Sequence, residues 1–182
     1  MPKKKSFHEK TLSEKTIFQG RVFKMVRQVV LLPNKKTSVR DLILHPGAVA
    51  MIPFDAKGNV LMVRQFRKAV GKDMLEIPAG TIDPGEALIT CVQRELQEEI
   101  GFKARKLSKL ASYYPAPGYT TEIIHIYVAE NLVPSRLDCD HDEFLEVIPM
   151  KIEKILECIR TGKIRDSKTV IGMLYYHLFR KK

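Results

Sequence analysis

The sequence predicts an α/β protein of the α+β type, in which a mixed β-sheet lies between helices and an N-terminal β-hairpin forms an arm. Strand-like runs are interspersed with one central helix and followed by two late helices, which leaves too few β–α–β alternations for a doubly wound parallel sheet. The chain has 182 residues, of which 45% are hydrophobic, so one domain with an added arm can bury a sizeable core.

The first 45 residues are expected to form the arm. A lysine-rich segment precedes a strand-like run at Val22–Leu32, a turn signal follows at Pro33–Lys36, and Thr37–Leu44 resumes an extended pattern. A two-stranded hairpin is marginally stable alone, so it must pack on the main domain or on a second subunit. We therefore divide the chain into an N-terminal arm at residues 1–45 and a main domain at residues 46–182.

The main domain is expected to begin with a second, more buried hairpin. Its strands are Ala48–Phe54 and Val60–Gln65, and a polar turn at Asp55–Asn59 joins them. A helix is predicted from about Glu86 to Ile100, and Gly101 is placed to end it. The other predicted elements are strands at Leu107–Tyr113, Ile123–Val128 and Leu145–Pro149, and helices at Ile152–Arg160 and Ser167–Phe179.

The net charge of +10 invites a nucleic-acid interpretation, but the surplus lies at the two ends of the chain. Residues 1–24 carry seven Lys or Arg and two Glu, residues 151–182 carry nine and three, and the middle holds fifteen positive against sixteen negative residues. Such ends are usually a solvated basic surface, so a nucleic-acid partner is not expected.

Composition also excludes several other classes. The longest apolar stretch, at residues 48–54, is far shorter than the ~20 residues of a membrane helix, and no apolar run follows the basic N-terminus as in a secretory signal. Cys91, Cys139 and Cys158 are odd in number and lack a CxxC spacing, which argues against a disulfide framework or a zinc site. We expect a cytoplasmic protein without a membrane partner.

Carboxylates gather on one face of the predicted central helix. Glu95, Glu98 and Glu99 are related by i, i+3 and i+4, so they lie within one arc beside an apolar face. Carboxylates crowded in this way repel one another unless a cation lies among them, and clusters of oxygen ligands suit Mg²⁺ or Mn²⁺. A solvated acidic face with Arg94 nearby is the alternative.

The spacing around this helix favours the metal site. The segment GTIDPGEALITCVQRELQEEIGF runs from Gly80 to Phe102 and resembles the Nudix box at every defining position. The resemblance implies a strand–loop–helix on a mixed sheet and hydrolysis of a nucleoside diphosphate linked to another group, with Mg²⁺ as cofactor and Mn²⁺ as a possible substitute. It also implies Glu95 and Glu99 as main metal ligands, joined by the Ala79 carbonyl and assisted by Glu98.

The resemblance further implies supporting roles within the box. Glu86 and Arg94 match residues that orient the carboxylates, while Gly80 and Gly101 serve the backbone rather than the chemistry. Glu98 and Glu99 are also candidate catalytic residues.

Outside the box, the chain resembles the ADP-ribose pyrophosphatase subgroup. Pro117 lies sixteen residues after Gly101, and the runs HPGAVAMIPF, VRQFR, EIPAGTID, SYYPAPGYTTE and DEFLEV fit the same pattern. By this resemblance Arg67 would touch the substrate diphosphate, with an exposed strand-end arginine as the alternative, and Glu122 could meet the terminal ribose. The role of Glu76, supporting either the metal site or the sheet, stays open.

Two further expectations come from the same resemblance. Glu143, in the acidic loop at residues 138–143, is the candidate base that deprotonates the attacking water, with Glu146 and Asp142 as alternatives. A homodimer is expected, in which the arm reaches the partner and Phe18 and Arg21, together with Phe23, stand in the region of the adenine pocket.

The predicted reaction is therefore Mg²⁺-dependent hydrolysis of ADP-ribose, or of a related nucleoside diphosphate sugar, to AMP and ribose 5-phosphate. Two alternatives stay open. One is hydrolysis of another nucleotide sugar or an oxidised nucleotide; the other, of a different class, is a basic RNA-binding or RNA-processing Nudix protein.

Overall fold

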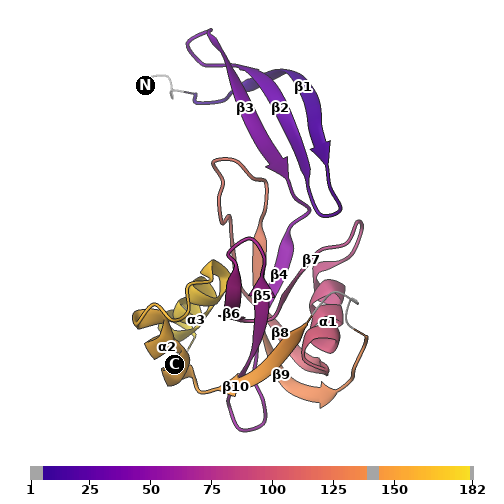
Figure 1. Ribbon diagram of the computed structural model, residues 1–182, viewed down its shortest axis with the longest axis vertical. Helices are drawn as coiled ribbons and strands as arrows, with labels where there is room; N and C mark the ends of the chain where they lie inside the picture. The colour runs from indigo at the N-terminus through magenta and orange to yellow at the C-terminus, as the bar shows by residue number, and fades with distance from the viewer. Residues whose placement is uncertain (1–5, 139–143, 181–182) are drawn as a thin grey trace, which may run out of the picture. The chain divides into compact units, whose positions relative to one another are not determined.

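The computed structural model describes residues 6–138 and 144–180 (Figure 1). The chain divides into two compact units: Met1–Pro46 together with Ala116–Glu122, and Gly47–Pro115 together with Ile123–Lys182. We refer to them as the first and the second unit. No helix among the described residues is long and apolar enough to cross a membrane.

The first unit is built on a three-stranded antiparallel sheet of order β1-β2-β3, formed by β1 Lys10–Gln19, β2 Lys24–Leu31 and β3 Thr37–Leu44. The predicted hairpin is present as β2 and β3, but β1 had not been predicted. All residues of β1 are exposed, so the strand lacks the apolar alternation by which a half-buried strand is identified. The segment 116–122 belongs to this unit because Tyr119 accepts a hydrogen bond from the Ile43 backbone N–H at 2.8 Å.

The second unit contains two sheets and all three helices of the described residues (Figure 1). The four-stranded sheet has the order β7-β4-β9-β8 and is mixed, since β4 and β9 are parallel and the other pairs antiparallel. The three-stranded sheet has the order β10-β5-β6 and is antiparallel. The elements are β4 Ala48–Pro53, β5 Val60–Arg67, β6 Lys72–Glu76, β7 Ala79–Thr81, α1 Leu88–Glu99, β8 Phe102–Tyr113, β9 Ile124–Pro134, β10 Leu145–Met150, α2 Ile152–Arg160 and α3 Ser167–Phe179.

One part of the strand prediction was wrong. The runs at 48–54 and 60–65 are strands, but they lie in different sheets and share only the isolated bridge between Phe54 and Val60. The turn at residues 55–59 is closed by Asp55, whose carboxylate accepts hydrogen bonds from the Asn59 and Lys57 backbone N–H groups. Beyond this turn β5 pairs with β6 and β10, and the short strands β6 and β7 had not been predicted.

The core of the second unit has two halves, because alternate residues of a strand point to opposite faces of a sheet. On one face, Val49 and Met51 of β4 pack with Val92 and Leu96 of α1. On the other face, Ile52 of β4 belongs to a cluster completed by α2 and α3, which includes Ile155 and Met173. The sheets are therefore held between α1 and the pair α2–α3, as the sequence predicts.

Candidate active site

The strand–loop–helix β7–α1 brings the acidic side chains of the candidate site together. The loop turns at residues 83–86, where the Glu86 backbone N–H donates to the Asp83 carbonyl at 3.0 Å and Gly85 adopts a φ of +79°. A β-carbon on Gly80 would lie 1.8 Å from the Glu95 carboxyl carbon, so only glycine allows that carboxylate to rest against β7. Gly101, with a φ of +74°, follows the end of the helix as predicted.

Arg94 lies at the centre of this cluster and joins carboxylates from the loop and the helix. Its Nε and Nη2 donate to Glu86 at 3.0 and 2.9 Å, and its Nη1 donates to Glu95 at 2.6 Å and to Glu98 at 3.0 Å. Nη2 also donates to the Thr81 carbonyl at 3.1 Å, which fastens the helix to the end of β7. Glu86 and Arg94, which were predicted to orient the carboxylates, are joined to each other and, through Arg94, to Glu95 and Glu98. We refer to this group as the Arg94 cluster.

Glu99 anchors the other end of the acidic face to β7. The Ala79 backbone N–H donates to Glu99 Oε2 at 2.9 Å, so this carboxylate lies at the backbone of the residue whose carbonyl was predicted as a metal ligand. Glu95 and Glu99 are only 7% and 5% exposed. Two nearly buried carboxylates, a third at Glu98 and a neighbouring peptide carbonyl offer only oxygen donors, the type of ligand that a hard divalent cation prefers.

In the structure itself the acidic groups are engaged by protein donors. Within residues 6–138 and 144–180, no three His, Cys, Asp or Glu side chains are arranged as a metal-binding group. Arg94 explains part of this arrangement, since it holds both Glu95 and Glu98. A cation bound by these carboxylates would therefore share them with the guanidinium.

The ion pairs of the Arg94 cluster favour the charged forms of Glu86 and Arg94. The hydrogen bonds from Arg94 hold the pKa of the Glu86 carboxyl at about 2, well below its ordinary value of 4.5. The same contacts, led by the hydrogen bond to Glu86, raise the pKa of the Arg94 guanidinium. Burial raises the pKa of the neighbouring Cys91 thiol, which keeps it protonated and unreactive.

A second ion network lies around Glu76, the last residue of β6, and we refer to it as the Glu76 cluster. Arg67 donates to Glu76 through Nε at 3.0 Å and through Nη2 at 2.7 Å, and Lys168 of α3 donates to the same carboxylate. Asp166 accepts from Lys168 Nζ at 3.0 Å and from the Thr169 backbone N–H at 2.9 Å, which caps α3. This network fixes Arg67 within electrostatic reach of Glu99.

The protonation states in the Glu76 cluster follow from the pairing. Burial opposes ionisation of Glu76, but its hydrogen bonds to Arg67 and its proximity to Lys168 outweigh burial and lower the pKa of the carboxyl. The hydrogen bond to Glu76 raises the pKa of Arg67. Sequence reasoning missed Lys168 and Asp166, because they lie about 90 residues from Glu76 in the chain and no local motif connects them.

The other predicted site residues are distributed as follows. Arg67 and the acidic helix belong to the second unit, whereas Phe18, Arg21, Pro117 and Glu122 belong to the first unit. Phe18 packs on Phe23 with ring centroids 6.1 Å apart. The candidate base Glu143 lies outside the described residues, as do Asp142 and Cys139; its alternative Glu146 lies on β10 and accepts from Arg64 at 3.2 Å.

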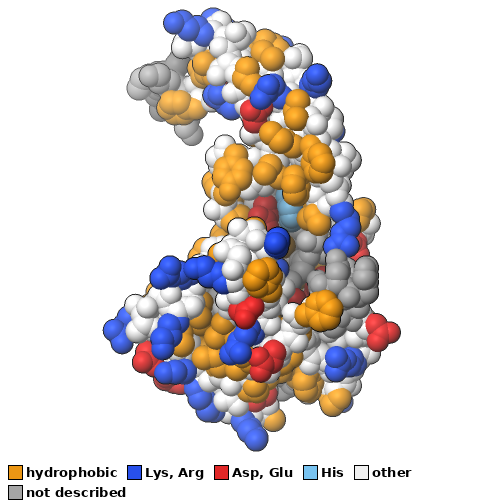
Figure 2. All heavy atoms as spheres, viewed as in Figure 1, with side chains coloured by type: hydrophobic (Ala, Val, Ile, Leu, Met, Phe, Trp, Pro, Cys, Tyr) orange, Lys and Arg blue, Asp and Glu red, His pale blue; other side chains and the backbone are white. Residues whose placement is uncertain are grey.

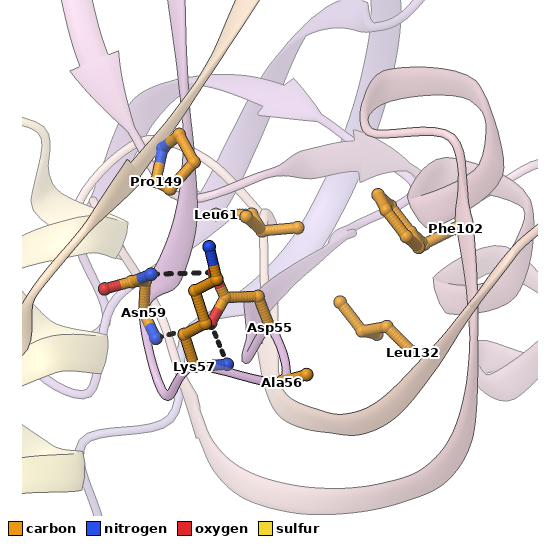
Figure 3. A pocket seen from close by; sticks show the side chains of 8 residues that line it. All are labelled: Asp55, Ala56, Lys57, Asn59, Leu61, Phe102, Leu132 and Pro149. Carbon is orange, nitrogen blue, oxygen red and sulfur yellow. Dashed lines mark hydrogen bonds between the residues drawn. The ribbon is translucent and has the colours of Figure 1, made fainter.

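A cavity of about 370 Å³ opens elsewhere in the second unit, beside the turn between β4 and β5 (Figure 3). Leu61, Phe102 and Leu132 form its apolar side, and the hydrogen-bonded turn at Asp55–Asn59 forms the other. None of the predicted site residues lines this cavity, so the cavity is not part of the candidate active site.

Comparison with known proteins agrees with the geometry. The profile of the NUDIX domain matches residues 44–168. The chain is 39% identical over 176 residues to an ADP-ribose pyrophosphatase of Bacillus subtilis (strain 168), a match that covers 96% of this chain and 95% of that protein. It is 41% identical, over the same length and coverage, to a methanol dehydrogenase activator of Bacillus methanolicus.

A solved structure supports the fold. The crystal structure of an ADP compounds hydrolase superimposes with a TM-score of 0.84 at 24% identity, covering 96% of this chain and 95% of that one.

Proposed function

The chain belongs to the Nudix family of pyrophosphohydrolases, and we propose that it hydrolyses the pyrophosphate of ADP-ribose, or of a related nucleoside diphosphate sugar, to AMP and ribose 5-phosphate. The observation that carries this proposal is the acidic face of α1, where Glu95 and Glu99 lie nearly buried against β7. The relative named as an ADP-ribose pyrophosphatase supports this substrate. A relative of similar identity is named as an activator of another enzyme. The activity of this chain is therefore argued from the residues of its site and not from a relative's name.

Nudix hydrolases use a divalent metal, and here we propose Mg²⁺, with Mn²⁺ as a substitute. Glu95, Glu99 and the Ala79 carbonyl would hold the ion, and Glu98 would assist. When bound, such an ion offsets the negative charge of the diphosphate and of the transition state. Glu86 and Arg94 would orient the carboxylates, because Arg94 joins the loop to the helix.

The chain's own residues supply the remaining parts of the proposed reaction. Arg67, fixed by Glu76, would bind a phosphate oxygen, since a guanidinium offers donors on more than one edge. The oxygen of a water molecule bonds to one phosphorus while the bridging oxygen leaves with the other, and a carboxylate accepts the water proton. We assign that carboxylate to Glu143, and we propose Pro117, Glu122, Phe18 and Arg21 as substrate contacts.

We further propose that the protein is a cytoplasmic homodimer whose arm, residues 1–45, takes part in the subunit contact. The first unit exposes several large apolar side chains, which a second subunit could cover. They are Phe7, Leu12, Ile17, Phe18, Val22, Phe23 and Val39. Light scattering of the purified chain tests the dimer, and a monomeric mass at micromolar concentration contradicts it.

The decisive experiment is a substrate panel assayed by product release with Mg²⁺. ADP-ribose, GDP-mannose, NADH and an 8-oxo-purine nucleotide serve as substrates, and EDTA serves as the negative control. The proposal expects ADP-ribose to give the highest kcat/KM, with AMP and ribose 5-phosphate in equal amounts. Weak turnover of every nucleotide together with RNA binding that falls steeply with salt would instead support the RNA-binding alternative.

A further inference from the structure

A cavity of about 340 Å³ lies in the second unit, between the edge strand β6 and the turn that connects α2 to α3. Its lining comes from two short segments, residues 70–75 and residues 162–165. The volume is within the range of small-molecule sites, at the lower end. None of the residues of the Arg94 cluster or the Glu76 cluster lines it.

The charge of this cavity is strongly positive. Lys72, Lys163 and Arg165 contribute three cations against the single carboxylate of Asp73. None of the ion pairs among the described residues includes Lys72, Lys163 or Arg165, although Lys163 lies within electrostatic reach of Glu157. Arg165 is held in place because its Nε donates to the Gly162 carbonyl at 2.8 Å, which leaves its two terminal nitrogens for a ligand. Figure 2 shows Lys and Arg side chains gathered over the region of α2 and α3.

The other residues that line the cavity indicate what chemical groups a ligand would carry besides an anion. Val70, Met74 and Leu75 supply apolar surface beside the cations, and Asp73 offers an acceptor for a hydroxyl group. A phosphate group with its two negative charges complements the cations. A small sugar attached to that phosphate would offer hydroxyl groups to Asp73 and its carbon skeleton to the apolar side chains. An extended polyanion would need a longer groove than this volume provides.

Both lining segments are held in place by the Glu76 cluster. Residues 72–75 lead directly into Glu76, and residues 162–165 lead into Asp166 and Lys168. Because Lys168 binds both Glu76 and Asp166, the two sides of the cavity are joined just beyond its lining. The cavity is thus framed by fixed backbone rather than by two independent loops.

We propose that this cavity binds a small phosphate monoester, such as a sugar phosphate, with Lys72, Lys163 and Arg165 contacting the phosphate. The site is distinct in its residues from the proposed catalytic site, and the proposal does not depend on the proposed function.

The test is calorimetric titration of the full chain with ribose 5-phosphate in EDTA, with ribose as the uncharged comparison. The double variant Lys163→Gln/Arg165→Gln should raise the Kd for ribose 5-phosphate at least ten-fold, and Lys72→Gln alone should raise it by a smaller factor. The matched control is Lys103→Gln/Arg105→Gln on β8, which removes the same two charges from exposed positions flanking a buried residue and should leave the Kd unchanged. Thermal melting confirms that each variant is folded.

The proposal would be overturned by no binding of ribose 5-phosphate to the unmodified chain, by an equal loss in the β8 control, or by binding of ribose as tight as that of its phosphate. A loss caused by Arg67→Gln but not by the Lys163→Gln/Arg165→Gln variant would also overturn it, because the phosphate would then lie in the catalytic site.

Discussion

The Arg94 cluster and the Glu76 cluster are ion networks in the same unit, the first with an excess of carboxylates and the second with two cations balanced by two carboxylates. In the first, one arginine is shared among Glu86, Glu95 and Glu98, so negative charge is in excess. In the second, one carboxylate that is 2% exposed is shared between Arg67 and Lys168. The Arg94 cluster can therefore accept a further cation, whereas the Glu76 cluster is closed and holds Arg67 in a fixed position.

The difference in charge balance suggests different roles for the two clusters. A surplus of carboxylates is costly in the folded protein unless a cation joins it, so the Arg94 cluster is suited to binding. A buried carboxylate saturated by two cations is costly to disturb, so the Glu76 cluster is suited to positioning. Substitutions in the two clusters should therefore affect activity, stability and metal binding differently.

The largest effect is expected for Glu99→Gln. The substitution keeps the size of the side chain and an acceptor for the Ala79 N–H, but it removes the charge proposed to bind the metal. We expect kcat to fall about 1000-fold, or about 4 kcal/mol in activation free energy, with little change in the melting temperature. Glu130→Gln, at an exposed ion pair with Lys106, is the matched control and should keep full activity. Full activity of Glu99→Gln would refute the proposed ligand set.

Glu76→Gln should act on stability first. Neutralising Glu76 leaves Arg67 and the buried Lys168 without their shared carboxylate, which costs about 3 kcal/mol in unfolding free energy. Denaturant unfolding measures this loss. The control Glu157→Gln removes an exposed pair with Lys154 and should leave the unfolding free energy nearly unchanged. If both variants lost the same small amount, the Glu76 cluster would not be the closed network inferred here.

Mg²⁺ should stabilise the protein through the acidic face of α1, which carries Glu95, Glu98 and Glu99, and not through the Glu76 cluster. At ten times its Kd, a ligand that binds only the folded state adds about 1.4 kcal/mol to the unfolding free energy. Differential scanning fluorimetry with and without Mg²⁺ should show a rise in melting temperature for the unmodified chain and for Glu76→Gln. The rise should be absent for Glu99→Gln; if it persisted there, Mg²⁺ would bind elsewhere.

The smallest effect is expected from pH. The pKa of Glu86 is lowered from 4.5 to about 2 in the folded protein, so its contribution to stability is complete above about pH 4.5 and is lost as the pH falls toward 2. The unfolding free energy of the unmodified chain, followed from pH 6 to pH 3, should therefore fall more steeply than that of Glu86→Gln. Parallel curves would mean that Arg94 does not hold Glu86 ionised.

The sequence predicted the parts of the molecule that local pattern controls. The i, i+3 and i+4 spacing of Glu95, Glu98 and Glu99 placed them on one helix face, and Gly101 was correctly predicted to end the helix. The two late helices were predicted with the bounds that the structure gives them. Such features need only the residues within one or two helical turns.

The errors occurred where pairing between distant segments decides the structure. Strand β1 was missed because both of its faces are exposed, and β4 and β5 were predicted as one hairpin although they lie in separate sheets. Proximity in the chain favours a hairpin, but the partners of β5 are β6 and β10, and β10 lies about 80 residues away.

By itself, then, the sequence determined the family, the acidic helix and the carboxylates that share one face of it, since helical periodicity and the box spacing are local properties. Only the tertiary structure decided how those side chains are joined. Gly80 had to lie beneath the Glu95 carboxylate, and Arg67, Glu76 and Lys168 had to meet from β5, β6 and α3. The physical reason is that an ion network forms wherever packing brings charges together, and separation along the chain does not specify that packing.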